Sequence, residues 1–249
     1  MRALLRWLLC LLLAGIALEL FFVLRITMMV SIDPQSTTFQ RSEAWRIVTA
    51  GRINGPSPWS QHWVPYAQIS GALKRAVIAS EDDDFIYHHG VEWDAIEAAR
   101  KRNERAQALA KRRALWAEAH GRPAPAPKIR GGSTITQQLA KNLLLSGERT
   151  LPRKAQELAL TVTLELLLDK RRILEIYLNN VEWGEGIYGA EAAARHYYGK
   201  SAAQLNAAEA ARLAVMLPNP RAFQRRSGSS YLARRSQVIE ARMNDVQIP

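Results

Sequence analysis

The amino-terminal part of the chain is an apolar stretch that suits a membrane better than a folded core. From Trp7 to Leu24 the side chains are apolar apart from Glu19, and the stretch begins at Leu4. A membrane-spanning helix needs about 20 mostly apolar residues, which residues 4–24 supply. A buried core helix is the weaker interpretation, because the stretch is apolar around its whole circumference. We therefore expect residues 1–30 to form a transmembrane anchor.

The charges beside this stretch predict its orientation. Arg2 and Arg6 lie on the short leading side, and the positive-inside rule keeps such residues in the cytoplasm. The rest of the chain would then lie outside the inner membrane. The alternative is a cleaved signal peptide, with Gly15 and Ala17 flanking the cut. Cleavage there would leave the apolar residues 20–24 at a new terminus, so an uncleaved anchor is favoured.

Composition narrows the classes open to the remaining chain. The 249 residues are 48% hydrophobic, so the chain can form a real core and is not disordered throughout. Cys10 is the only cysteine, which excludes an intramolecular disulfide framework and a cysteine-based zinc cluster. Lys and Arg number 34 against 23 Asp and Glu, a net charge of +11. This excess predicts an anionic partner: nucleic acid, a phospholipid surface or a phosphorylated substrate.

Behind the anchor the chain divides into a connector and a helical domain. Residues 31–68 hold four prolines among polar and aromatic residues, so we expect an irregular connector. In residues 69–249 apolar side chains recur at helical spacing and alternating strand patterns are nearly absent, which predicts a mainly α domain. A basic helix is expected from about Asp94. It should stop before Gly121, where a proline-rich extended segment follows.

Local signals predict further helices in the second half of the domain. Thr134 and Gln137 have the spacing of a capping box. Pro152 is typical of a first helical residue. Residues 158–168 of that helix are apolar on nearly all sides, which predicts a central buried position. Asn206 is expected to cap another helix.

Residues 81–90 are the first candidate site. Their run of carboxylates is typical of a solvated helix end, whereas Glu81 at the edge of a cleft would suit a general base. Asp82, Asp83 and Asp84 would raise the pKa of Glu81 by like-charge repulsion. A metal site at residues 88–89 is weaker, because adjacent histidines point apart.

Three further segments carry polar groups. Residues 131–142 begin a helix with Gly-Gly-Ser-Thr, which suits an anion, although an ordinary capped helix explains it equally well. Arg153 and Glu157 lie one helical turn apart, commonly a surface pair, but here the helix becomes apolar directly afterwards, which indicates a cleft. The glycines in residues 184–189 indicate tight loop geometry, and a structural role is favoured for most of them.

Together these segments resemble the peptidoglycan glycosyltransferases of family 51. The resemblance rests on four motifs in the family's order, which are Glu81-Asp82-x-x-Phe85-x-x-His88-x-Gly90, Gly132-Ser133-Thr134-Ile135-Thr136-Gln137-Gln138-Leu139-x-Lys141-Asn142, Arg153-Lys154-x-x-Glu157 and Ile173-Leu174-Glu175-x-Tyr177-Leu178-Asn179. Residues 205–220 resemble the family's last motif. The family implies a lysozyme-like helical lobe, a smaller mobile lobe near the membrane (residues 91–130 here) and polymerisation of lipid II outside the inner membrane. Residues 221–249 are too few for a transpeptidase domain, which implies the monofunctional form.

The resemblance also implies roles for single residues. Glu81 would be the general base. Lys141, Arg149 and Arg153 would form a cationic clamp on the diphosphate. Glu157 would position this clamp or hold a divalent cation, Mg²⁺ or Mn²⁺, against the diphosphate. The implied diphosphate-binding residues are Lys141, Arg149, Arg153, Ser133 and Thr134. The implied substrate-binding residues are Phe85, His88, Gln137, Gln138, Asn142 and Asn179. The implied partners are lipid II, the growing lipid-linked glycan, the membrane and other cell-wall synthesis proteins, and not nucleic acid.

Two features depart from the family's pattern. Gln156 stands where many members carry a basic residue, and residues 91–130 are long for the family, with a basic helix that has no assigned role. Two rival interpretations come from other classes. A lysozyme-like hydrolase would share the helical lobe and a catalytic glutamate, but it would not need the cationic cluster of Lys141, Arg149 and Arg153. A membrane-anchored scaffold without enzymatic activity would not need Glu81 at all.

We predict that residues 1–30 remain on the mature protein and hold it in the membrane. The apolar residues that would follow a cut near Ala17 are better buried in a bilayer than exposed at a new terminus. Intact-mass measurement of the protein extracted from membranes checks this. A mature chain that starts near Leu18 would show that the segment is a signal peptide.

Overall fold

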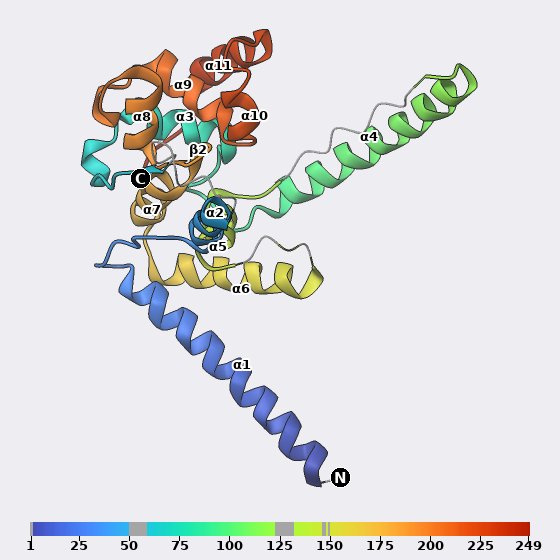
Figure 1. Ribbon diagram of the computed structural model, residues 1–249, viewed down its shortest axis with the longest axis vertical. Helices are drawn as coiled ribbons and strands as arrows, with labels where there is room; N and C mark the ends of the chain where they lie inside the picture. Colours follow the sequence, from blue (N-terminus) through green and yellow to red (C-terminus); the bar gives the residue numbers. More distant parts are fainter. Residues whose placement is uncertain (1, 50–58, 123–131, 146–147, 149) are drawn as a thin grey trace.

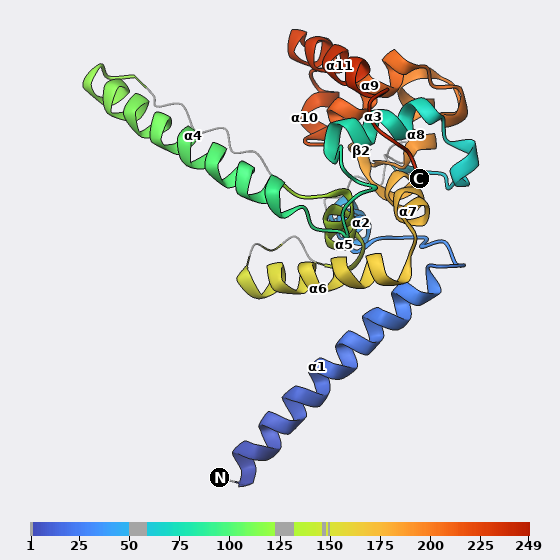
Figure 2. The ribbon, with the colours of Figure 1, turned by 180° about the vertical axis from the view of Figure 1, so that it is seen from behind.

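The computed structural model describes residues 2–49, 59–122, 132–145, 148 and 150–249. Within this part of the chain the fold is mainly helical, as predicted. Most helices pack together in one part of the molecule, which we call the head. Two long helices project from the head, α1 (Arg2–Met28) and α4 (Trp93–Ala119) (Figure 1). The view from behind shows the same two helices leaving the head in different directions (Figure 2).

The core of the head is built by helices that come from distant parts of the sequence. Helix α3 (Gly71–Glu81) packs against α9 (Ala207–Met216), which also packs against α11 (Ser230–Arg242). Three alanines of α9 are fully buried, namely Ala210, Ala211 and Ala214, and small side chains let backbones approach closely. Around these helices lie α5 (Ile135–Leu144), α6 (Leu151–Leu167), α7 (Lys170–Asn180), α8 (Ala190–Tyr198) and α10 (Pro220–Gln224).

A small sheet closes one side of the head. Its strands are β1 (Ser60–Gln61), β2 (Glu182–Gly184) and β3 (Ile187–Tyr188), in the order β1-β3-β2. Strand β1 is parallel to β3, and β2 is antiparallel to it. These strands have two or three residues each, too few for an alternating pattern to be visible in the sequence. The sheet binds the connector to the loop between α7 and α8.

The prediction that residues 31–68 form an irregular connector is wrong in part, because α2 occupies Thr38–Thr49. A capping box starts this helix: the Gln40 amide N–H donates to the Thr37 hydroxyl at 3.0 Å, and the Thr37 N–H donates to the Gln40 side chain at 2.8 Å. The prolines that suggested an irregular segment lie outside these residues.

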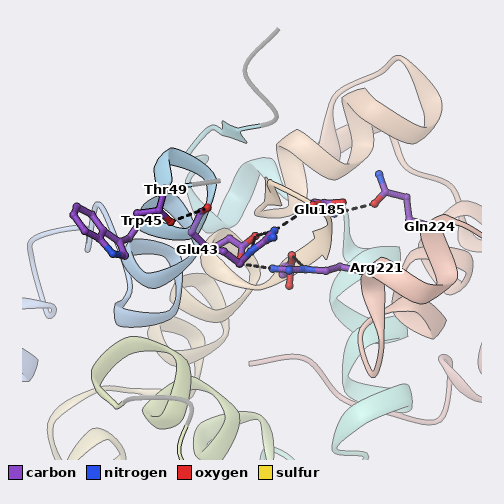
Figure 3. Close-up of polar contacts among 8 residues, drawn as sticks. Glu43, Trp45, Thr49, Glu185, Arg221 and Gln224 are labelled. Atoms are coloured by element: carbon purple, nitrogen blue, oxygen red, sulfur yellow. Dashed lines mark hydrogen bonds and ion pairs between the residues drawn. The ribbon is translucent and has the colours of Figure 1, made fainter. Parts of the chain in front are cut away.

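Charged side chains fix α2 to the head (Figure 3). The Arg221 guanidinium pairs with buried Glu43 of α2 at 3.0 Å and with Glu182 of β2 at 2.7 Å. Arg46 of α2 reaches Glu185 at 3.2 Å, and the Glu185 N–H donates to Gln224 at 2.8 Å. Hydrogen bonds from the neighbouring guanidiniums lower the pKa of Glu43 despite its burial. Helix α2 is therefore an integral part of the folded head.

The prediction that residues 158–168 of helix α6 are buried on nearly all sides is also wrong. Thr150 caps the helix, Pro152 is its second residue rather than its first, and only one face is buried. The opposite face is apolar; it consists of the exposed Leu151, Ala155, Ala159, Val162 and Leu166 and the half-buried Leu158. Leu151 is 88% exposed and Leu166 78%. Both ribbon views place α6 beside the end of α1, and the two helices are in contact (Figures 1 and 2).

Helix α1 is long and apolar enough to cross a membrane, and it is the only described helix that is. Its side chains are almost all exposed, except near its carboxyl end, where Phe22 and Ile26 are buried against the head. A core helix would bury most of its length, so this interpretation does not fit the structure.

Helix α4 matches the basic helix predicted from about Asp94, and it ends before Gly121 as expected. Its first turns approach the start of α5 closely. A Cβ placed on Gly132 would lie 3.0 Å from the Ala95 carbonyl oxygen and 3.0 Å from the Ala99 Cβ, so a larger residue there would press against α4. The mobile lobe predicted for residues 91–130 stays a prediction, and its last residues lie outside the described part of the chain.

Candidate active site

Glu81, the predicted base, is the last residue of α3. Its carboxylate accepts a hydrogen bond from the Gln138 side-chain amide at 2.9 Å and a longer one from the Ser80 hydroxyl at 3.4 Å. The pKa of Glu81 is raised, and the largest cause is burial, which disfavours the charged form. Repulsion from Asp82 is a smaller cause, so the predicted direction is confirmed but the predicted main cause is wrong.

Gln138 is itself fixed by a second hydrogen bond. The Tyr177 hydroxyl of α7 donates to the Gln138 side-chain oxygen at 3.0 Å. The chain Tyr177–Gln138–Glu81 therefore joins α7, α5 and α3. Gln138, predicted to bind substrate, contacts the candidate base directly.

Asp82 joins the loop after α3 to the start of α5. It is buried, and one carboxylate oxygen accepts the Ile135 N–H at 2.9 Å. The other lies 2.8 Å from Nε2 of His88. Nδ1 of His88 accepts the Gly90 N–H at 3.1 Å, so we assign the ring hydrogen to Nε2, which donates to Asp82. This hydrogen bonding holds the first two motifs together.

Two cavities share a wall beside this junction. The first has a volume of about 430 Å³ and is lined by Glu81, Asp82, Asp83, Glu92, Asp94, Ala95, Ala98, Arg102, Gly132, Ser133 and Thr134. The second, of about 540 Å³, is lined by Ile96, Ala99, Arg100, Asn103, Glu104, Gln107, Gly132, Ser133, Gln137 and Lys154. Gly132 and Ser133 face both cavities, and α4 provides the opposite wall of each. The cavity lined by the candidate base Glu81 therefore adjoins a cavity lined by Lys154.

The cationic group lies at the start of α6. Glu157 is buried and accepts a hydrogen bond from the Arg153 guanidinium at 2.9 Å, and it also pairs with the Lys154 ammonium. Within the described residues the buried Nε of Arg153 has no hydrogen-bond partner. The sequence prediction omitted Lys154 from the site, although its spacing of three residues before Glu157 was a signal for a contact on the same helix face.

Several predicted site residues use their polar atoms inside the protein. Thr134 and Gln137 form the predicted capping box, and the Thr134 hydroxyl donates to the Gly90 carbonyl at 2.6 Å. The buried Asn179 side chain donates to the Val64 carbonyl at 3.0 Å and accepts the Val64 N–H at 2.9 Å. These contacts position loops and the connector.

The remaining predicted residues are placed as follows. Phe85 is fully buried under the Lys170 ammonium, 4.6 Å from the ring centre. Lys141 and Ser133 are exposed and Asn142 is half-buried; Lys141 and Asn142 are not among the residues that line the two cavities. Arg149 lies outside the described residues. Roles of these residues in substrate binding stay predictions.

The surroundings of Glu157 do not favour a metal ion held by the protein. The Arg153 guanidinium and the Lys154 ammonium both already pair with its carboxylate. Among the described residues there is no group of three or more His, Cys, Asp and Glu side chains that could hold a metal. The predicted Mg²⁺ or Mn²⁺ stays a prediction.

The half-buried carboxylate of Glu81 lies next to a cavity that Arg100 and Lys154 line, an arrangement that suits a group-transfer enzyme. The head that carries it follows an apolar helix long enough to cross a membrane. A sequence model of the transglycosylase family matches residues 49–244, and the chain belongs to this family. A protein from Herminiimonas arsenicoxydans named biosynthetic peptidoglycan transglycosylase is 47% identical over 251 residues, covering 100% of this chain and 99% of its own length. A protein of the same name from Burkholderia thailandensis is 50% identical over 236 residues, covering 95% of this chain and 84% of its own.

We predict that Asp82→Asn destabilises the fold. An asparagine can accept one of the two hydrogen bonds but presents an amide to the other donor, and losing a buried charge-assisted hydrogen bond costs about 2 kcal/mol in free energy of unfolding. Thermal melting by circular dichroism in detergent measures the effect. Asp83→Asn is the matched control, because Asp83 is exposed and pairs at the surface with Arg242. Equal melting temperatures for the two variants would contradict the role given to Asp82.

Proposed function

We propose that this transglycosylase polymerises lipid II into β-1,4-linked glycan strands of peptidoglycan and releases polyprenyl diphosphate. The observation that supports this most is the pair of adjoining cavities, one containing Glu81 and the other Lys154, with Gly132 and Ser133 between them. A disaccharide acceptor and a diphosphate leaving group need such neighbouring environments. The names of the related proteins support the same substrate class.

Glu81 is the general base in this proposal. Its carboxylate takes the proton from the acceptor's 4-hydroxyl, the oxygen attacks the donor's anomeric carbon, and the bond from that carbon to the diphosphate oxygen breaks. Attack opposite the leaving group turns an α linkage into a β linkage. A pKa raised by burial makes Glu81 a stronger base than an exposed carboxylate. A diphosphate leaves as an anion, so the second carboxyl group that glycoside hydrolysis needs is not required.

Cationic side chains stabilise the departing diphosphate. Arg153 and Lys154 are held at the start of α6 by Glu157, and Lys141 and Arg149 complete the clamp in our proposal. Ser133 stands just before the capped start of α5, where backbone N–H groups and the helix dipole favour an anion. Glu157 keeps Arg153 and Lys154 together despite their like charges.

We also place the head on the membrane surface. Helix α1 crosses the inner membrane with its amino end in the cytoplasm, so the head lies in the periplasm. The apolar face of α6 then rests in the interfacial layer, because it is exposed in the head and lies beside the end of the anchor. This position keeps the cationic start of α6 close to the headgroups of a lipid-linked substrate. Contacts with other cell-wall synthesis proteins stay a prediction.

Glu81→Gln tests the base. It keeps the shape of the side chain but cannot take a proton, so we expect no glycan polymer from labelled lipid II on a gel, with unchanged affinity for a diphosphate-mimicking inhibitor. Glu157→Gln should lose binding as well, because it loosens the clamp. Polymerisation by Glu81→Gln within a few-fold of the parent rate would make Glu157 the leading candidate for the base.

The clamp is tested separately. Lys141→Ala and Arg149→Ala should each slow polymerisation about 10²–10³-fold with unchanged melting temperature.

The apolar face of α6 should contact lipid. In protein whose Cys10 is replaced by serine, spin labels are attached at Leu166→Cys or Val238→Cys and the protein is reconstituted in liposomes. We expect the label at 166 to be relaxed by oxygen dissolved in the bilayer and the label at 238, on exposed α11, by an aqueous nickel complex. Equal aqueous accessibility at the two positions would remove α6 from the membrane surface.

A further inference from the structure

We propose that Tyr177 is a positioning residue for the base: its hydroxyl holds the Gln138 side chain so that the amide N–H, and not the amide oxygen, faces Glu81. This inference rests on the proposed function of Glu81. It assigns a role to a tyrosine that does not line the Glu81 cavity and so does not touch the substrate there.

The geometry sets the orientation of the Gln138 amide. Tyr177 is 1% exposed, and its hydroxyl lies 3.0 Å from the Gln138 oxygen. On the other side the Gln138 nitrogen lies 2.9 Å from the Glu81 carboxylate. A 180° rotation of the amide would turn its oxygen toward the carboxylate, where two electron-rich oxygens repel. It would also leave the Tyr177 hydrogen facing an N–H₂ group, and within the described residues that hydrogen has no other acceptor.

Tyr177 can serve as a permanent donor. Burial, and to a smaller extent the nearby Glu81 and Asp82, raise the pKa of Tyr177 well above its ordinary value. The hydroxyl therefore stays protonated wherever the enzyme works. A rigid helix carries each member of the chain, so the amide is held without depending on a loop.

The consequence for the base is electrostatic. A donated N–H stabilises the ionised carboxylate and opposes the effect of burial, so Glu81 is ionised over a wider pH range. Other groups also act on this carboxylate: Asp82 raises its pKa and Arg235 of α11 lowers it. Further charged side chains line the same cavity, namely Asp83, Glu92, Asp94 and Arg102. From α9, the Ala214 carbonyl oxygen lies 3.5 Å from the Ser80 hydroxyl and competes with Glu81 for its hydrogen. None of these groups changes when the Tyr177 hydroxyl is removed.

Tyr177→Phe is the test, read as a pH–rate profile of lipid II polymerisation. Without the hydroxyl the amide can rotate, the protonated form of Glu81 is favoured, and the acid limb of the profile moves to higher pH. We expect a roughly tenfold lower rate near neutral pH, since misplacing a catalytic group is costly. The rate should recover toward the parent value at alkaline pH, with KM for lipid II unchanged. A profile that superimposes on that of the parent would overturn the proposal.

Two controls separate positioning from simple destabilisation. Tyr197→Phe also removes a single tyrosine hydrogen bond, to the Trp183 carbonyl at 2.9 Å, and should leave the acid limb in place. In a double-mutant cycle, Tyr177→Phe should add nothing once Gln138 is alanine, because it acts through Gln138. Losses that multiply in the double variant would show that Tyr177 acts by another route.

Failure of the proposed function is distinguishable. If Glu81→Gln still polymerises lipid II, the base assignment fails whatever Tyr177→Phe does. If only Tyr177→Phe behaves like the parent, the assignment of Glu81 stands and the positioning role is wrong. Should Tyr177→Phe melt far below the parent, replacing Tyr177 by 3-fluorotyrosine keeps the packing and strengthens the donor. The acid limb should then move to lower pH, and an unmoved limb would again overturn the proposal.

Discussion

The buried carboxylate of Asp82 is the interaction on which the site depends. It accepts the Ile135 N–H at the start of α5 and the His88 ring N–H from the loop after α3. Two segments more than 50 residues apart are thereby fixed against each other. Glu81, the neighbour of Asp82, and Gln138, one turn into α5, meet because this junction sets the spacing between their helices. A buried charge that lost either donor would carry a large desolvation cost, so the junction strongly favours one arrangement.

The site separates two kinds of electrostatic environment over a short distance. On the Glu81 side, burial and the neighbouring Asp82 carboxylate favour the protonated form of Glu81, and the Gln138 N–H opposes this in part. At the start of α6, two cations surround one buried carboxylate and leave a net positive charge. Gly132 allows α4 to approach so closely that one helix lines both cavities. In our proposal the base and the anion site thus lie side by side without neutralising each other.

This arrangement distinguishes the proposal from its rivals. A lytic enzyme of similar fold needs an acid for the leaving sugar but no cationic group, whereas here Arg153 and Lys154 are held in place by a buried partner. A scaffold needs neither the raised pKa of Glu81 nor a fixed amide beside it. Nucleic-acid binding does not explain why an anchor and an exposed apolar helix face lie next to each other.

The sequence by itself determined the features that depend on neighbours along the chain. The apolar anchor, the capping box of Thr134 and Gln137, the basic helix and the ordered motifs were all readable, because helix caps and periodicity act over a few residues. Helix α2 was missed although Thr37 and Gln40 carry the same cap signal, since nearby prolines suggested irregular chain. Only the tertiary structure decided the rest. Helix α6 is apolar on several sides, and periodicity cannot tell which side faces protein and which faces outward. That Tyr177 reaches Gln138 and Lys154 faces a cavity follows from how helices pack, because side chains far apart in sequence meet only when the core fixes the distances between their backbones.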